Sequence, residues 1–158
     1  LPTQVVHAFQ STLEESKGVD LLLHVVDSSQ EFVEQQEETV IGLIRDLEME
    51  EIPIITIYNK KDEMHADFIP RLHPNIVISA LDSKDIDHLK EFLWEEIKKL
   101  LVPYKKSVSL LDGGTLLNQL QQETFVETID LDEETNDYLV SGYAKANSKW
   151  LGEKSLNE

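Results

Sequence analysis

The chain has 158 residues, of which 41% are apolar and 28% charged, and its formal net charge is −17. This size and composition are typical of one globular domain, or of one domain with a small appendage. The absence of cysteine excludes disulfides, thiol nucleophiles and thiolate metal sites, and the excess of acidic residues disfavours strong nonspecific binding to nucleic acid.

The sequence also predicts where the protein resides. It has no run of about 18 apolar residues, and its first residues lack the basic segment and apolar core of a signal peptide. We therefore expect a cytoplasmic protein with no membrane partner. The chain begins at Leu1 without an initiator Met, so we expect it to be a piece of a longer protein.

Apolar strands alternate with amphipathic helices in the first hundred residues, which predicts an α/β fold. In chain order the predicted elements are a helix over 3–16, a strand over 21–26, a helix over 31–50, strands over 52–58 and 75–79, and a helix over 85–101 with Asp85 as candidate N-cap. This order is typical of an open parallel sheet with right-handed crossovers and flanking helices.

A change of pattern at Val102 and Pro103 predicts a boundary between two domains, 1–102 and 103–158. The second is predicted to be a small α+β domain with a strand over 105–110, a helix over 115–122, a hairpin of 124–130 and 137–144, and a helical turn at 147–151. Its core is thin for independent folding at about 55 residues, so we expect it to dock on the first domain.

Three polar segments follow the predicted parallel strands, at 27–29, 59–62 and 79–82. Ligands of open parallel sheets bind beyond the carboxyl ends of the strands. The second segment reads Asn-Lys-Lys-Asp and the third begins Ser-Ala. This pair resembles the guanine-recognition elements of P-loop GTPases. The residues predicted to bind guanine are Asn59, Lys60, Asp62, Ser79, Ala80 and Leu81.

The chemistry of guanine explains these residue types. Guanine presents two donors, the ring N1–H and the exocyclic amine, and the Asp62 carboxylate can accept both. The backbone N–H of Ala80 can donate to guanine O6, where adenine carries an amine. The Lys60 stem can lie over the base, and Asn59 can tie the loop to its neighbours. A wrong base leaves buried polar groups unpaired, at about 1–3 kcal/mol for each.

Other interpretations of these segments stay open. A lone Asn-Lys-x-Asp string is also compatible with a polar turn after a strand. Asp27, with Thr56 and Lys60, loosely resembles the phosphoacceptor site of a phosphorelay receiver, but the acidic pair that such receivers need is missing. The histidines show no metal-ligand spacing, and His24 within an apolar strand is typical of a core histidine.

A longer resemblance runs through residues 1–9, 11–15 and 20–29 and on to Ser79-Ala80. These segments resemble the HflX family of GTPases, starting immediately after that family's Asp-x-x-Gly switch element. Val102-Pro103-Tyr104 and the α+β tail resemble the family's small C-terminal domain. The resemblance implies a parent protein that hydrolyses GTP with Mg²⁺, binds the large ribosomal subunit, and splits or rescues stalled ribosomes.

The phosphate half of such a site is missing from this sequence. It contains no Gly-x-x-x-x-Gly-Lys-Ser/Thr loop, upstream switch threonine or Asp-x-x-Gly, and that loop holds the phosphates and Mg²⁺ in the family. We therefore predict no catalytic or metal-binding residue here, GTP or GDP as a ligand of the base-reading half, and no GTP hydrolysis by this chain alone.

Two further expectations follow from the resemblance. The phosphate-loop strand of the fold would lie beside the strand at 21–26, so we expect an exposed sheet edge there that favours self-association or covering. The alternative function is a protein-docking or ribosome-docking module, formed from residue 103 onward, that acts independently of nucleotide.

Overall fold

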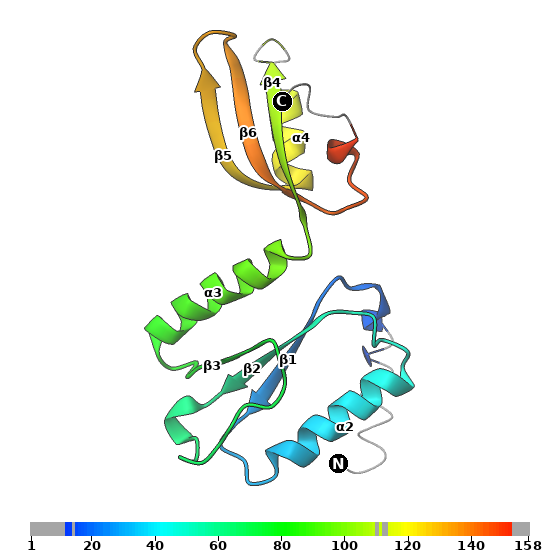
Figure 1. Ribbon diagram of the computed structural model, residues 1–158, viewed down its shortest axis with the longest axis vertical. Coiled ribbons are helices and arrows are strands. Elements are labelled where there is room, and N and C mark those ends of the chain that lie inside the picture. The colour runs from blue at the N-terminus through cyan, green and yellow to red at the C-terminus, as the bar shows by residue number, and fades with distance from the viewer. Residues whose placement is uncertain (1–11, 14, 110, 112–113, 153–158) are drawn as a thin grey trace. The chain divides into compact units, whose positions relative to one another are not determined.

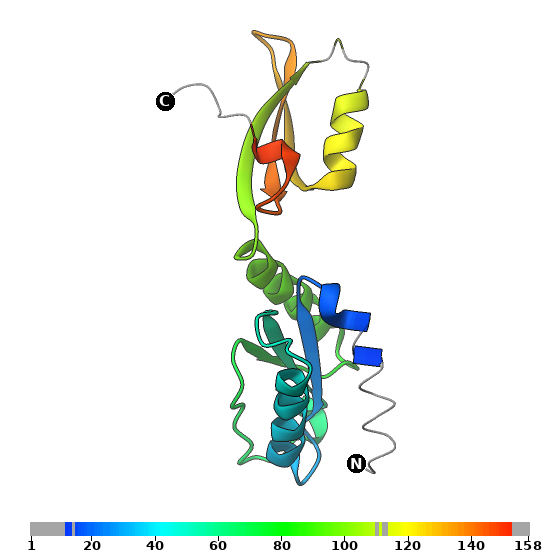
Figure 2. The same cartoon turned by 90° about the vertical axis from the view of Figure 1, so that its right-hand side faces the viewer.

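The computed structural model describes residues 12–13, 15–109, 111 and 114–152. The chain divides into two compact units, Leu1–Lys90 and Glu91–Glu158 (Figures 1 and 2). The domain boundary predicted at residues 102 and 103 stays a prediction. Most of the helix predicted over 3–16 lies outside the described residues; Glu15–Gly18 at its end form a 3-10 turn, η1.

A parallel sheet lies at the centre of the first unit. Its strands β1 (Leu22–Asp27), β2 (Ile54–Asn59) and β3 (Asn75–Val77) lie side by side in the order β1-β2-β3. The β-branched, apolar runs favour strands. The central strand β2 pairs with β1 on one side and with β3 on the other, and its four middle residues are buried. Asp27 and Asn59 are partners in the register, so these strands end together.

Helix α2 (Val33–Asp46) covers one face of this sheet through two apolar clusters. One contains Val33 with Val26 and Tyr58, and the other packs Leu43, Ile44, Leu47 and Met49 against Leu22 and Ile54. The helix ends before the predicted residue 50 because Glu48 adopts a left-handed φ of 57°. The Glu48 N–H donates to the Arg45 carbonyl, and the Met49 N–H donates to the Ile44 carbonyl. This pair of bonds is the Schellman motif of helix ends.

The connection from β2 to β3 is held by one buried phenol. After the 3-10 turn η2 (Lys61–Glu63), the chain runs without a helix to β3. The Tyr58 hydroxyl donates to Glu37 Oε1 at 2.6 Å and accepts the N–H groups of Arg71 and Leu72 at 3.2 and 3.1 Å. Burial and the Glu37 carboxylate raise the pKa of Tyr58. The connection is therefore fixed against the sheet and α2.

Helix α3 (Ser83–Lys98) begins two residues before the predicted start. The prediction that Asp85 is its N-cap was wrong, because Asp85 lies within the first turn. Asp82 Oδ1 instead accepts the Lys84 N–H at 2.8 Å, which is the bond that an N-cap side chain makes. The Asp85 carboxylate is free to bond elsewhere.

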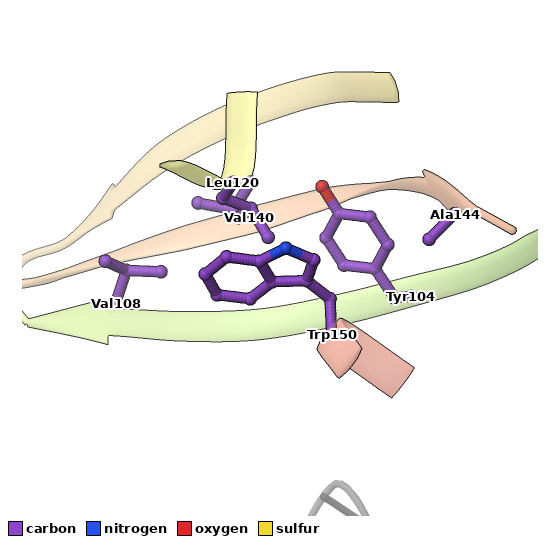
Figure 3. Close-up of a cluster of buried hydrophobic side chains, with 6 residues drawn as sticks. All are labelled: Tyr104, Val108, Leu120, Val140, Ala144 and Trp150. Atoms are coloured by element: carbon purple, nitrogen blue, oxygen red, sulfur yellow. The ribbon is translucent and has the colours of Figure 1, made fainter. Parts of the chain in front are cut away.

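The second unit is an antiparallel sheet with a helix on one face. Strands β4 (Val102–Ser109), β5 (Phe125–Asp132) and β6 (Asp137–Ala144) lie in the sheet in the order β4-β6-β5. Along the chain, helix α4 (Thr115–Glu123) connects β4 to β5, and the 3-10 turn η4 (Lys149–Leu151) follows β6. The core between sheet and helix consists of Tyr104, Val108, Leu120, Val140, Ala144 and Trp150 (Figure 3).

Polar contacts complete the second unit. Trp150 Nε1 donates to Glu123 Oε2 at 2.7 Å, and the Tyr104 and Thr124 hydroxyls lie 2.7 Å apart. A Cβ at position 142 would lie 2.1 Å from the Phe125 carbonyl oxygen, so Gly142 permits the close approach of β5 to β6. The predicted fold class, a parallel α/β sheet flanked by helices and followed by a small α+β part, is confirmed.

Candidate functional site: the loops after the parallel strands

The three segments predicted to bind a ligand meet where the parallel strands of the first sheet have their carboxyl ends. Asp27 and Asn59 are register partners at the ends of β1 and β2, and the Lys61 N–H donates to the Ile78 carbonyl at 3.0 Å just before Ser79. This proximity follows from the fold, because parallel strands place their carboxyl ends at the same edge.

Asn59 links all three segments. Its side-chain oxygen accepts the Ala80 N–H at 3.0 Å. Its backbone carbonyl accepts the N–H of Ser28 at 3.0 Å and also the Ser28 hydroxyl. The Ala80 N–H, expected to face guanine O6, therefore donates to Asn59 in this structure. An oxygen of a bound base would have to share or replace that bond.

Lys60 is held by a carboxylate from β1. Its φ of 65° is left-handed, and its Nζ lies 2.9 Å from Asp27 Oδ2. Asp27 also accepts the Ser29 N–H at 3.1 Å, the Ser29 hydroxyl at 2.6 Å and Gln30 Nε2 at 3.1 Å. The Lys60 ammonium and these donors hold the pKa of Asp27 well below its usual range, and Asp27 in turn raises the pKa of Lys60.

Asp62 differs from Asn59 and Lys60, whose side chains both have polar partners. It lies in η2 and is exposed. Its carboxylate makes no hydrogen bond or ion pair with any residue in the described part of the chain. A carboxylate of this kind, on a loop fixed on both sides, can accept two donors from a ligand.

The segment after β3 is partly buried. Ser79 is 6% exposed, and its hydroxyl accepts the Leu81 N–H at 3.4 Å, whereas Leu81 itself is 90% exposed. All six predicted guanine-binding residues thus belong to two loops joined by the Asn59–Ala80 bond. Ser79 and Leu81 bring backbone groups and apolar surface rather than a charged group.

Sequence reasoning missed a second carboxylate and its partner. Asp85 Oδ2 accepts the Ser79 N–H at 2.8 Å, and both Asp85 oxygens lie 3.3 Å from Lys61 Nζ. The Ser79 N–H and the Lys61 ammonium lower the pKa of Asp85. The sequence signal for this contact was weak: Asp85 is an acidic residue near the start of α3, the helix that follows the 79–81 segment.

A groove of about 850 Å³ lies next to the free edge of β1, between this strand and α2. Among the described residues β1 pairs with β2 alone, and Leu23 and Val25 are 48% and 61% exposed. His24 also lines the groove, and burial lowers its pKa against the opposing effect of Glu37.

Two absences concern the described residues alone. In this part of the chain, no group of three or more His, Cys, Asp or Glu side chains could hold a metal ion. The helices seen here include none that is both long enough and apolar enough to cross a bilayer.

Comparison with known proteins gave several relatives. No protein-family model matches the chain. "GTPase HflX" of Alkalihalophilus pseudofirmus is 42% identical over 162 residues, covering 100% of this chain and 38% of that protein. The proteins of the same name from Magnetococcus marinus and Chlamydia pneumoniae are 31% and 34% identical over 131 and 140 residues, each covering 80% of this chain and 30% of the relative. The chain thus spans between 30% and 38% of these relatives' length.

Proposed function

Because this chain belongs to the HflX family of GTPases, we propose that it carries the guanine-reading part of a GTP-binding domain. The observation that supports this most is that the 59–62 and 79–81 loops are hydrogen-bonded to each other and that the first loop carries the exposed Asp62 carboxylate. Asn59 joins the loops at 3.0 Å, and Asp62 stays exposed beside them.

In this proposal each residue has one task. Asp62 accepts the N1–H and the amine of guanine in a charge-assisted fork. Lys60, held by Asp27 at 2.9 Å, places its stem along the face of the base. The Ala80 N–H donates to guanine O6 and shares its bond with Asn59, while Ser79 and Leu81 shape the rim. Adenine offers neither donor pair nor carbonyl, so it leaves Asp62 and Ala80 unsatisfied.

We propose GTP hydrolysis for the longer parent protein and not for this chain. The sequence has no phosphate loop and no switch element, so the residues that would hold the phosphates and Mg²⁺ are not in it. Contacts to the base of a few kcal/mol correspond to roughly millimolar affinity or weaker. We expect GDP and GTP to bind weakly and no phosphate release in a pure preparation.

The test of base reading is an NMR titration of the ¹⁵N-labelled chain with GDP, GMP and ADP. We expect the amides of residues 59–62 and 79–81 to shift with both guanine nucleotides and not with ADP. GMP is the informative ligand because it carries the base with a single phosphate. Equal shifts with ADP, or none with either guanine nucleotide up to several millimolar, would exclude a guanine site in this chain.

For the parent we further propose a cytoplasmic role on the large ribosomal subunit, in splitting or rescuing stalled ribosomes. This rests on the family resemblance, since the net charge of −17 does not favour binding to rRNA.

The alternative is a docking module within residues 103–158 whose binding does not depend on nucleotide. The separately packed core around Trp150 favours that alternative. Co-sedimentation of the chain with purified ribosomal subunits, with and without GDP, separates the two, because a docking module pellets equally in both.

We also propose that the free edge of β1 is paired when the protein functions. Leu23 and Val25 are half-exposed, and within the described part of the chain one edge of β1 has no partner strand. The isolated chain is then expected to self-associate, and sedimentation velocity measures this directly. A monomer at high concentration, with β1 amides fully protected from exchange, would contradict the proposal.

A further inference from the structure

The carboxylate of Asp85 bonds to both loops that we propose to read guanine, 59–62 and 79–81. Its Oδ2 accepts the Ser79 N–H at 2.8 Å, and its two oxygens lie 3.3 Å from Lys61 Nζ. The Asp85 side chain is 11% exposed, whereas that of Lys61 is 51% exposed. A buried carboxylate with two partners from different loops fixes their spacing more firmly than a surface ion pair does.

Helix capping does not account for this arrangement. Asp82 already makes the capping bond, to the Lys84 N–H at 2.8 Å, and the Asp82 N–H donates to the Ser79 carbonyl at 3.0 Å. Asp85 lies in the first turn, where the helix dipole favours a negative charge. Its side chain reaches back past the cap to Ser79, so its bonds hold the loop rather than the helix end.

The two neighbouring lysines pair with different carboxylates. Lys60 pairs with Asp27 at 2.9 Å, and Lys61 pairs with Asp85 at 3.3 Å. Asp62 directly follows them and has no partner among the residues that the structure describes. A lysine released from its own carboxylate is close enough in sequence to compete for Asp62, and that competition would occupy the oxygens that a base needs.

We infer that Asp85 is a positioning residue, which couples the 59–62 loop to the 79–81 loop and keeps Lys61 away from Asp62. The inference takes the identity of the ligand, a guanine base, from the proposed function. Asp85 itself does not touch the base. Its effect on binding runs through Lys61 and through the backbone of Ser79.

The test uses the whole ¹⁵N-labelled chain and four variants. For weak binding, the initial slope of the Asp62 amide shift against GDP concentration is inversely proportional to Kd. We expect Asp85→Ala to lower this slope about fivefold, the effect of one exposed ion pair competing for Asp62. Asp87→Ala is the matched control, because Asp87 lies on the same helix, is exposed, and among the described residues bonds to Lys90 alone, at 3.2 Å. It leaves the slope unchanged.

The double variant Asp85→Ala with Lys61→Met separates positioning from general structural damage. Removing the freed lysine restores at least half of the lost slope if Lys61 competes for Asp62. A purely structural role of Asp85 gives no such recovery. Asp85→Asn keeps an acceptor for Ser79 and loses the charge that holds Lys61, so its slope falls between those of the wild type and Asp85→Ala, and it decides the question if Asp85→Ala does not fold.

A measurement without nucleotide distinguishes failure of this inference from failure of the proposed function. Loss of the bond to Asp85 speeds hydrogen exchange at the Ser79 amide, and Asp87→Ala does not. If the wild type ignores GDP while Ser79 exchange responds to Asp85→Ala, guanine reading is wrong and the loop coupling stands. If Asp85→Ala matches Asp87→Ala in slope and in Ser79 exchange, the coupling is overturned.

Discussion

The free edges of the two sheets expose apolar side chains in different ways. On β5, Ile129 and Leu131 are 39% and 52% exposed, but Asp130 and Asp132 alternate with them. On β1, Leu23 and Val25 are 48% and 61% exposed, and only His24 lies between them. Charges along an edge prevent pairing with other strands. β5 is therefore an edge protected by charge, whereas β1 is suited to be covered by another strand.

The same substitution at a leucine in the core and at a leucine on β1 is expected to give the largest difference in stability. Leu120 is fully buried in the second unit, so Leu120→Ala is expected to lower the free energy of unfolding by about 2–5 kcal/mol. Leu23→Ala removes a half-exposed side chain and is expected to cost less than about 1 kcal/mol. Urea unfolding followed by tryptophan fluorescence reports the second unit alone, because Trp94 and Trp150 both lie there, and circular dichroism reports both units. Equal losses for the two variants would contradict the half-exposed position of Leu23 on β1.

Acid is expected to weaken the second unit. The Lys149 ammonium and the Trp150 N–H lower the pKa of Glu123 below 4.5, so the ionised form is favoured by folding. This contribution is fully present above pH 4.5 and is lost as the pH falls through the lower folded-state value. The urea midpoint from tryptophan fluorescence should therefore decrease below pH 4.5, and Glu123→Gln should flatten that decrease. An identical acid limb in the variant would show that other groups cause it.

A glycine within α2 gives a smaller effect of opposite sign. Apart from its chain neighbours and the nearby helix backbone, no atom of the described residues lies within 4 Å of a Cβ built at Gly42, and glycine is less favourable than alanine within a helix. Gly42→Ala is expected to stabilise the first unit by about 0.5–1 kcal/mol, measured by circular dichroism. Gly142→Ala provides the contrast, since its Cβ would meet the Phe125 carbonyl oxygen at 2.1 Å, and it is expected to destabilise the second unit. Stabilisation by both would show that β5 and β6 are not so closely packed.

A charge on each free edge gives the smallest effect on stability. Val25→Lys and Leu131→Lys both replace half-exposed side chains, and each should change the free energy of unfolding by less than about 0.5 kcal/mol. Only Val25→Lys is expected to reduce self-association in sedimentation velocity, because β1 has no carboxylate beside its exposed apolar side chains, whereas Asp130 and Asp132 flank Leu131. Equal behaviour of the two variants would remove the distinction between the edges.

The sequence predicted the strands and the positions of the two candidate loops because their signals are local. Apolar runs marked β1 and β2, and Asn59–Asp62 with Ser79-Ala80 stood directly after strands. The early end of α2 was missed because Glu48 has no glycine-like sequence signal for its left-handed backbone. The partnership of Lys61 with Asp85 was also missed, since it joins residues 24 positions apart and depends on the turn that Asp82 caps.

The engagement of the Ala80 N–H by Asn59 shows a second limit of sequence reasoning. The motif indicated which groups can bond to guanine, and it did not indicate which of them bond to each other without a ligand. Such internal bonds depend on loop geometry rather than on residue type. They also keep the loops in place before a base arrives, which reduces the ordering entropy that binding must overcome.

Asp62→Asn in the NMR titration tests the account of guanine reading most directly. Xanthine differs from guanine by a carbonyl in place of the exocyclic amine, so it matches an amide donor where guanine matches a carboxylate oxygen. With the wild type, we predict that the amides of residues 59–62 and 79–81 shift with GDP and not with xanthosine diphosphate. Asp62→Asn is predicted to reverse that preference. An unchanged preference in the variant would show that Asp62 does not read the base.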